Sequence, residues 1–136
     1  MVILGLTGSI AMGKTEAAKA FRRLGVHVHD ADKAVHGLMA RGGLAVDQVQ
    51  ALFPESVKDG RVDRTALGQR VFGDADDLRN LEAILHPLVH KAERRFLSAA
   101  ARRGEKIVVL DIPLLFETGG EGRCDLVAVV TAPTRI

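Results

Sequence analysis

Eight residues near the N-terminus have the types and spacing that bind a row of phosphate groups. The segment GSIAMGKT, residues 8–15, satisfies the pattern G-x-x-x-x-G-K-[ST] and follows a short apolar run. Glycines let the backbone curl with its N–H groups facing a ligand, and the start of a helix adds a positive partial charge. We therefore predict that the loop beginning at Gly8 binds a nucleoside triphosphate.

The last residues of this motif have separate expected roles. Lys14 would reach the β- and γ-phosphates, and the Thr15 hydroxyl would complete the coordination of a Mg²⁺ ion otherwise held by water and phosphate oxygens. The carboxylate of Glu16 would repel a nearby phosphate, although its backbone N–H can still donate. We expect the Glu16 side chain to turn toward solvent.

Two aspartates follow the second apolar run, in the segment VHVHDADKAVH. Asp30 and Asp32 would lie at the carboxyl end of a strand, the edge where α/β sheets bind ligands, and one of them could orient an attacking hydroxyl. Asp30 could instead cap the next helix, so Asp32 is our candidate base. A metal cluster with His27 and His29 is disfavoured, because alternation along the strand places only the two histidines on one face.

Two further segments carry candidate residues with open alternatives. Asp111 closes the apolar run IVVLD and either holds Mg²⁺ through water or caps a turn. Glu117, Leu114 and Leu115 could line the pocket of the substrate that receives the phosphate. For the two leucines, packing in the core is the alternative.

The two histidines of ILHPLVH have the spacing of a zinc-binding helix. His86 and His90 stand at helical i, i+4 spacing, but Pro87 occupies the place where the zinc motif H-E-x-x-H needs its glutamate. His86 is either a substrate contact or a structural histidine beside a kink. The nearby basic stretch HKAERRFLSAAARR is interpreted as a solvated helix face, since no aromatic stacking platform accompanies it.

The elements that must position these groups alternate between strand and helix. Apolar, β-branched runs predict buried strands, and runs with apolar residues at helical spacing predict helices. The expected strands are 2–7, 26–29, 106–110 and 126–130, and the expected helices are 14–24 and 33–40. Residues 44–102 are mainly helical, with a break at PESVKDGRVD and a long segment from Asp76 that Pro87 must kink or interrupt. This order predicts an α/β domain with a mostly parallel sheet.

Composition narrows the class of protein. The chain has 136 residues, 47% hydrophobic and 26% charged, with a net charge of +2, which suits one soluble domain and lacks the basic excess of a nucleic-acid binder. No apolar run is long enough to cross a bilayer, and no signal peptide is expected, so we predict no membrane association. Cys124 is the single cysteine, which fits a reducing cytoplasm. Oligomeric state stays open.

Four segments together resemble the dephospho-CoA kinase family. They are GLTGSIAMGKT, VHDADKAVH, ILHPLVH and VLDIPLLFETG, in that family's order and across nearly the whole chain. The resemblance implies ATP-dependent phosphorylation of the ribose 3′-hydroxyl of dephospho-CoA, the last step of coenzyme A biosynthesis. It implies a P-loop NTPase-type, three-layer α/β/α fold over residues 1–136. In it, residues 1–40 and 104–136 would form the nucleotide-binding core and 41–103 a helical substrate-binding region.

The resemblance also assigns roles residue by residue. Asp32 matches the aspartate proposed as catalytic base, and Arg64 lies in the region that frames the acceptor. Other matches fall in the ATP-phosphate segment, which is Ala11, Met12, Gly13, Lys14, Thr15 and Glu16, on the substrate side at His86 and Pro87, and between Asp111 and Glu117. Ala11 stands where the family usually has glycine, and Glu16 where it has threonine. The family continues past VVTAPTRI into lid helices and a final strand, so we expect both to be absent here.

Two other functions compete with this reading. The first is a shikimate- or nucleoside-type kinase, since shikimate kinases also combine the phosphate loop with an aspartate pair after the second strand. The triple-glycine acceptor motif of shikimate kinases is missing here, however. A nucleotide-binding switch without turnover would be supported by a guanine-specifying NKxD motif, and none occurs.

Overall fold

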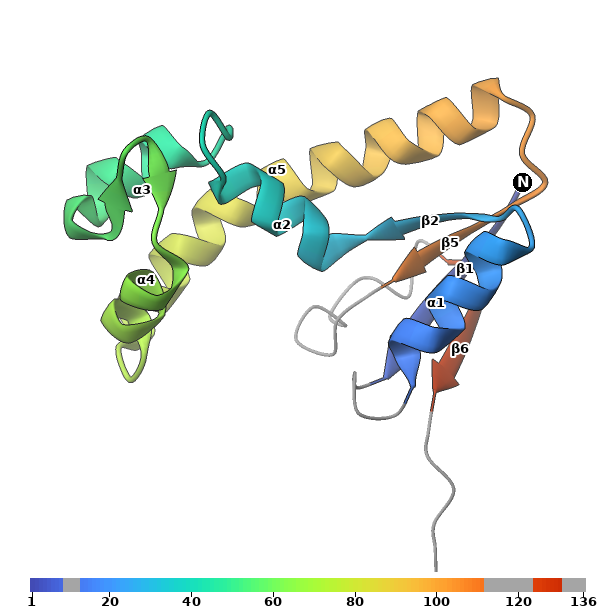
Figure 1. Ribbon diagram of the computed structural model, residues 1–136, viewed down its shortest axis with the longest axis horizontal. Coiled ribbons are helices and arrows are strands. Elements are labelled where there is room, and N and C mark those ends of the chain that lie inside the picture. Colours follow the sequence, from blue (N-terminus) through green and yellow to red (C-terminus); the bar gives the residue numbers. More distant parts are fainter. Residues whose placement is uncertain (9–12, 112–123, 131–136) are drawn as a thin grey trace, which may run out of the picture. The chain divides into compact units, whose positions relative to one another are not determined.

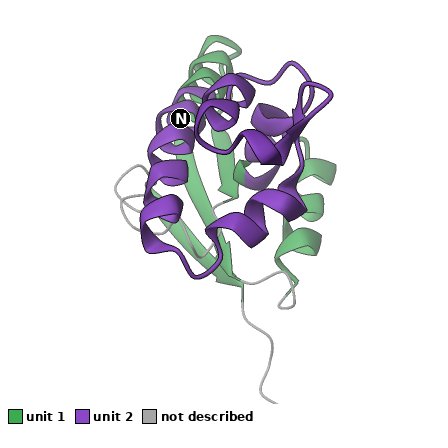
Figure 2. Cartoon of the chain, turned by 90° about the vertical axis from the view of Figure 1, so that its left-hand side faces the viewer, with its two compact units in different colours: residues 1–31, 93–136 green, residues 32–92 purple. Residues whose placement is uncertain are grey.

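The structure is a computed structural model that describes residues 1–8, 13–111 and 124–130. Its chain divides into two compact units, shown in different colours in Figure 2. The first unit comprises residues 1–31 and 93–136, and the second comprises residues 32–92. The helical region predicted at 41–103 therefore overlaps the second unit, which also takes in residues 32–40 but not 93–103.

The first unit is built on a parallel four-stranded sheet with the order β2-β5-β1-β6 (Figure 1). Its strands are β1 (Val2–Gly8), β2 (His27–Asp30), β5 (Ile107–Asp111) and β6 (Leu126–Val130). Leu6 of β1 and Asp30 of β2 are both Cα partners of Asp111. Because all four strands run in one direction, their carboxyl ends form one edge, where β1 gives way to the predicted phosphate loop.

Helices cover both faces of this sheet. Helix α1 (Lys14–Arg23) packs its buried Ala18 against Leu6 and Val109 on one face. On the other face, the His29 ring lies 5.2 Å from that of Phe96 on helix α5 (Ala75–Arg102), measured between centroids. Neighbouring residues of a strand point to opposite faces, so α1 and α5 lie on opposite sides of the sheet. The unit therefore has three layers, a helix, the sheet and a helix. The predicted α/β class with a parallel sheet is confirmed.

The second unit is mainly helical around an apolar core. Its elements are α2 (Ala31–Met39), α3 (Val46–Leu52), a 3₁₀ turn η2 (Pro54–Ser56), β3 (Val57–Lys58), β4 (Arg61–Val62), α4 (Arg64–Val71) and the first part of α5. The core residues share almost complete burial; they are Leu38, Met39, Ala45, Val46, Val49, Phe53, Val62, Leu67, Leu81, Ile84 and Leu85. Apolar residues at helical spacing thus account for most of this unit.

A two-residue hairpin occupies the break predicted at PESVKDGRVD. Strands β3 and β4 pair antiparallel around Asp59 and Gly60, whose φ values are 54° and 74°. Positive φ at both central residues is the geometry of the type I′ turn, which the Asp-Gly pair favours. The sequence signal for this hairpin was therefore present, although only a break was predicted.

Helix α5 continues through Pro87. Of the two outcomes expected at this proline, a kink or an interruption, the interruption is therefore wrong. A proline inside a helix removes the hydrogen bond to the carbonyl four residues earlier, here that of Ala83. Both Ala83 and Pro87 are exposed, so water can satisfy the carbonyl and the helix need not end. No helix of the described residues is both long enough and apolar enough to cross a bilayer.

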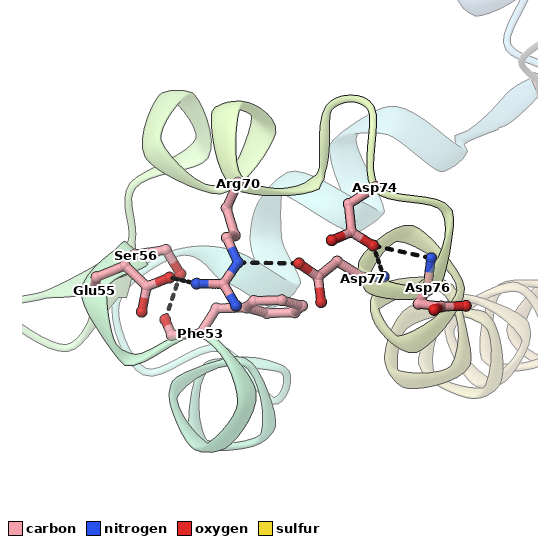
Figure 3. A network of polar contacts seen from close by, with 7 residues as sticks. All are labelled: Phe53, Glu55, Ser56, Arg70, Asp74, Asp76 and Asp77. Carbon is pink, nitrogen blue, oxygen red and sulfur yellow. Dashed lines mark hydrogen bonds and ion pairs between the residues drawn. The ribbon is translucent and has the colours of Figure 1, made fainter.

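An arginine joins three segments of the second unit (Figure 3). Arg70 donates from Nε to Asp77 at 3.0 Å and from its terminal guanidinium nitrogen to Glu55 at 2.7 Å. Its guanidinium carbon lies 5.6 Å from the centre of the Phe53 ring. The hydrogen bond to Asp77 is the largest of the effects that raise the pKa of Arg70. This residue therefore ties α4 to the 3₁₀ turn and to α5.

Candidate nucleotide-binding site

The strand and the helix that flank the predicted phosphate loop are present at the carboxyl edge of the sheet. Strand β1 ends at Gly8 and α1 begins at Lys14. Gly8 has a φ of 130°, and a Cβ there would lie 2.6 Å from the carbonyl oxygen of Val130 on the neighbouring strand. Only glycine therefore fits where the strand gives way to the loop. The predicted contacts Ala11 and Met12 lie outside the described residues.

Gly13 sets the direction of the helix that follows. It occupies the N-cap of α1 in the left-handed region, with φ 87° and ψ 15° and no side-chain cap. A Cβ at Gly13 would meet nothing within 4 Å, so the demand for glycine is conformational rather than steric. The first N–H groups of a helix lack intrahelical partners and carry the positive end of its dipole. This end of α1 is consequently suited to an anion.

Lys14 and Asp111 form a buried ion pair at this edge. The Lys14 Nζ lies 2.8 Å from Asp111 Oδ1, and the two side chains are only 6% and 10% exposed. Lys14 begins α1 and Asp111 ends β5, which is hydrogen-bonded to β1 (Figure 1). Two charges buried this deeply are tolerated because each compensates the other. The sequence placed both residues at the site but did not predict that they pair.

Thr15 and Glu16 follow in the first turn and face outward. Both are exposed, and the side chain of Glu16, 72% exposed, has a carboxylate oxygen 3.5 Å from the Lys19 Nζ. The expectation that Glu16 turns toward solvent is confirmed. The Thr15 hydroxyl and the Asp111 carboxylate are hard oxygen donors of the kind that Mg²⁺ prefers. Among the described residues no three His, Cys, Asp or Glu side chains cluster as metal ligands. Any Mg²⁺ here would therefore depend on water and phosphate oxygens as well.

The two candidate aspartates after β2 fall in different units. Asp30 is the last residue of β2 and is the Cα partner of Asp111 on β5. It directly precedes α2, which is the position that the alternative role as a helix cap requires. Asp32 is the second residue of α2 and is exposed. An exposed carboxylate in a first helical turn is accessible to a substrate, so Asp32 remains our candidate base.

His29 differs from its neighbour His27 by being sequestered. It lies against Phe96 and close to the buried carboxylate of Glu93. Burial lowers the pKa of His29, and the negative charges of Glu93 and then Asp30 oppose that shift in part. His27 is exposed, with its Nε2 3.3 Å from Glu105. The two histidines thus have different surroundings: His29 packs against an aromatic ring, and His27 lies at the surface beside Glu105.

The remaining predicted residues belong to the second unit or lie outside the described chain. Arg64 begins α4, where its guanidinium contacts Nδ1 of His36, a residue that sequence reasoning did not single out. His86 and Pro87 are exposed on α5. Leu114, Leu115 and Glu117 lie outside the described residues, so their roles stay predictions.

Known proteins resemble this chain over almost its whole length. The family model described as dephospho-CoA kinase matches residues 2–136. The dephospho-CoA kinase of Paramagnetospirillum magneticum is 67% identical over 98% of this chain and 63% of its own length. That of Mesorhizobium japonicum is 57% identical over the whole chain and 68% of its own length. The chain therefore spans about two thirds of the length of these relatives.

Solved structures show the same fold. A crystal structure from Thermus thermophilus has a TM-score of 0.78 and 41% identity, covering 97% of this chain and 66% of that one. The dephospho-CoA kinase from Campylobacter jejuni has a TM-score of 0.79 at 24% identity, covering 98% of this chain and 67% of that one, a likeness of fold alone. With the family model matching almost every residue, the chain belongs to the dephospho-CoA kinase family.

Proposed function

We propose that this chain takes part in the transfer of the γ-phosphoryl group of ATP to the ribose 3′-hydroxyl of dephospho-CoA. The products are coenzyme A and ADP, so the reaction is the last step of coenzyme A biosynthesis, and we place it in the cytoplasm. The observation that carries the proposal is the buried Lys14 at the start of α1, at the sheet edge where phosphate would bind. Family membership supports the choice of acceptor.

In this proposal Lys14 changes partner when ATP binds. Its ammonium group is held at the sheet edge by Asp111, so little side-chain reorganisation is needed to meet the β- and γ-phosphates. The backbone N–H groups at the start of α1 and in the loop of residues 8–15 donate to phosphate oxygens. Lys14 thus offsets the negative charge that accumulates on the transferred group.

Asp32 has the second role. Its carboxylate accepts a hydrogen bond from the 3′-hydroxyl, aims that oxygen at the γ-phosphorus and receives the proton as the new bond forms. Arg64, His86 and Pro87 lie in the same unit as Asp32 and are assigned to the acceptor. Thr15 and Asp111 would hold Mg²⁺, directly or through water, and a bound Mg²⁺ would neutralise phosphate charge during transfer.

An ADP-release assay with MgATP tests the proposal. Dephospho-CoA, shikimate and a blank without acceptor are compared on this chain. The same assay is run on this chain extended with the C-terminal third of the Paramagnetospirillum magneticum relative. We expect ADP release that depends on dephospho-CoA, and a product whose phosphorus NMR spectrum matches authentic coenzyme A. ADP release that is equal without acceptor, or greater with shikimate, in both chains would overturn it.

A further inference from the structure

We propose that His29 is a positioning residue for the candidate base Asp32, an inference that rests on the proposed function. His29 is the next-to-last residue of β2, and this strand leads directly into α2, whose second residue is Asp32 (Figure 1). Through its contacts with α5, His29 would hold the end of β2 and so fix the direction in which the chain reaches Asp32.

Strand β2 is held less firmly by its backbone than the other strands of the sheet. It is the shortest of the four, and it lies at the edge, where among the described strands it pairs with β5 alone. None of its four residues is fully buried. A short edge strand that buries little surface opens more readily than a central one. Side-chain contacts near its carboxyl end therefore help to decide where the backbone runs.

Helix α5 supplies the contacts of His29. The centre of the Phe96 ring lies 5.2 Å from that of the imidazole. Burial lowers the pKa of His29, and Glu93, which is 6% exposed, is close enough for its negative charge to oppose that shift. Because Glu93 and Phe96 are three residues apart on a helix, they lie on one face of it. The imidazole is thus set against an aromatic ring and a buried carboxylate of the same helix.

Packing alone does not account for a histidine at this position. The Nε2 atom of His29 is buried and has no hydrogen-bond partner among the described residues. A buried polar atom without a hydrogen bond costs free energy, whereas a valine would bury no polar atom there and is favoured in strands. Such a cost indicates a role other than packing. Valine could not reproduce the contact of the imidazole with the Glu93 charge.

The contact lies where the chain passes between its two units. The first passage is between Ala31 and Asp32, and the second is between Ala92 and Glu93. His29 lies two residues before Ala31, and Glu93 directly follows the second passage, so both belong to the first unit. Their contact therefore constrains both passages from the side of the first unit, and Asp32 is the first residue beyond one of them.

A displaced base would slow phosphoryl transfer without weakening the binding of ATP. In the proposed function Asp32 aims the 3′-hydroxyl at the γ-phosphorus, and a displacement of about 1 Å can cost about 10²-fold in rate. Replacing His29 leaves the Asp32 carboxylate itself present, so a smaller loss of about tenfold is expected. The phosphates of ATP are assigned to Lys14 and the loop of residues 8–15, which do not depend on His29.

The test compares His29→Val with the matched control His27→Val, which changes the exposed histidine of the same strand. Each substitution is made in the wild type and in Asp32→Asn, and kcat and both KM values are measured by ADP release in the two chains described above. Urea unfolding establishes that every variant is folded. Hydrogen exchange of the backbone amides of residues 28–37 reports how firmly the junction of β2 and α2 is held.

We expect His29→Val to lower kcat about tenfold, to leave both KM values within about twofold and to speed exchange at the junction about tenfold. His27→Val should change none of these by more than about twofold. In Asp32→Asn, adding His29→Val should change kcat by less than about twofold, because a positioning residue acts through the residue that it positions.

Two results would overturn the inference and leave the proposed function intact. One is a kcat of His29→Val that stays within about twofold of the wild type, or unchanged exchange at the junction. The other is an equal loss of kcat with and without the Asp32 carboxylate, which would show that His29 does not act through Asp32. A wild type without turnover of dephospho-CoA in either chain would instead overturn the proposed function, and the assignment of His29 to the base with it.

Discussion

The two units differ in where their charged side chains lie. We call the first unit, residues 1–31 and 93–136, the sheet unit and the second, residues 32–92, the helical unit. Among the described residues, the buried charged side chains Lys14, Glu93 and Asp111 all belong to the sheet unit. In the helical unit the one buried polar side chain is Ser56, whose hydroxyl donates to the carbonyl oxygen of Phe53 at 2.7 Å. A fixed, desolvated charge can stabilise the charge that develops during a reaction without moving. An exposed positive charge can attract an anion, but salt screens that attraction. Buried charge is thus a property of the sheet unit, and exposed charge one of the helical unit.

The largest expected effect comes from Lys14. We expect Lys14→Met to lower kcat by about 10³-fold or more, because it removes the charge that offsets the transferred phosphoryl group. It also leaves the buried Asp111 carboxylate without its 2.8 Å partner, which costs about 3–5 kcal/mol of unfolding free energy. The ADP-release assay and urea unfolding measure the two effects.

A second substitution separates these two effects of Lys14. Adding Asp111→Asn to Lys14→Met removes the unpaired charge, so most of the lost stability should return while turnover stays low. If the double variant recovered activity together with stability, Lys14 would be a structural residue and the contrast between the units would fail.

Asp32 is expected to give the next largest effect, and it lies in the helical unit. Asp32→Asn should lower kcat by at least about 10²-fold, because an amide cannot receive the proton of the 3′-hydroxyl, and leave the affinity for ATP unchanged. Asp47→Asn is the matched control, since Asp47 is also exposed in the first turn of a helix of that unit. Equal kcat values for the two variants would remove Asp32 from the chemistry.

Stability of the helical unit should depend on apolar contacts rather than on charge. Phe53 is 1% exposed in the core and Phe72 is 90% exposed. Phe53→Ala should lower the free energy of unfolding by about 3–5 kcal/mol, and Phe72→Ala should change it by less than about 0.5 kcal/mol. Urea unfolding monitored by circular dichroism measures both. A similar loss for the two variants would mean that the unit is not organised around Phe53.

Features of the fold that depend on local sequence could be predicted, whereas those that depend on tertiary contacts could not. The sequence placed all four strands of the sheet. Burial on both faces explains the apolar run of β5, whose residues from Val108 onward are buried. It does not explain β2, which carries two histidines and an aspartate, or β6, whose residues Leu126, Val127 and Val129 are exposed. The Asp59-Gly60 hairpin was missed although its turn chemistry is local, since its strands of two residues show no alternation. The continuity of α5 through Pro87 could not be read from sequence, because it depends on Ala83 being solvated.

The site shows a similar limit. The motif at residues 8–15 is enough to predict phosphate and Mg²⁺ contacts for Lys14 and Thr15, because the spacing of glycine and lysine is a local property of one loop. The pairing of Lys14 with Asp111 depends on β5 lying beside β1, which only the strand order reveals. The cavity bordered by Arg41 and Arg61 could not be predicted for the same reason, since these residues come together through the hairpin.

The smallest expected effect is a pH dependence that belongs to the sheet unit. Burial against Phe96 lowers the pKa of His29 below its ordinary value of 6.5, while Glu93 and Asp30 oppose the shift. The unfolded chain therefore binds this proton more readily than the folded one. His29 consequently contributes its stability above pH 6.5, and that contribution is lost as the pH falls through the lower folded-state pKa.

Replacing His29 should flatten that part of the stability profile. Urea unfolding of the wild type between about pH 7.5 and pH 5, a range that spans the ordinary histidine pKa, should show a free energy of unfolding that falls as the pH falls. His29→Gln should reduce this slope. His27→Gln, on the same strand but exposed, should keep it. A slope that stayed the same in His29→Gln would show that the burial of His29 is not the source of the pH dependence.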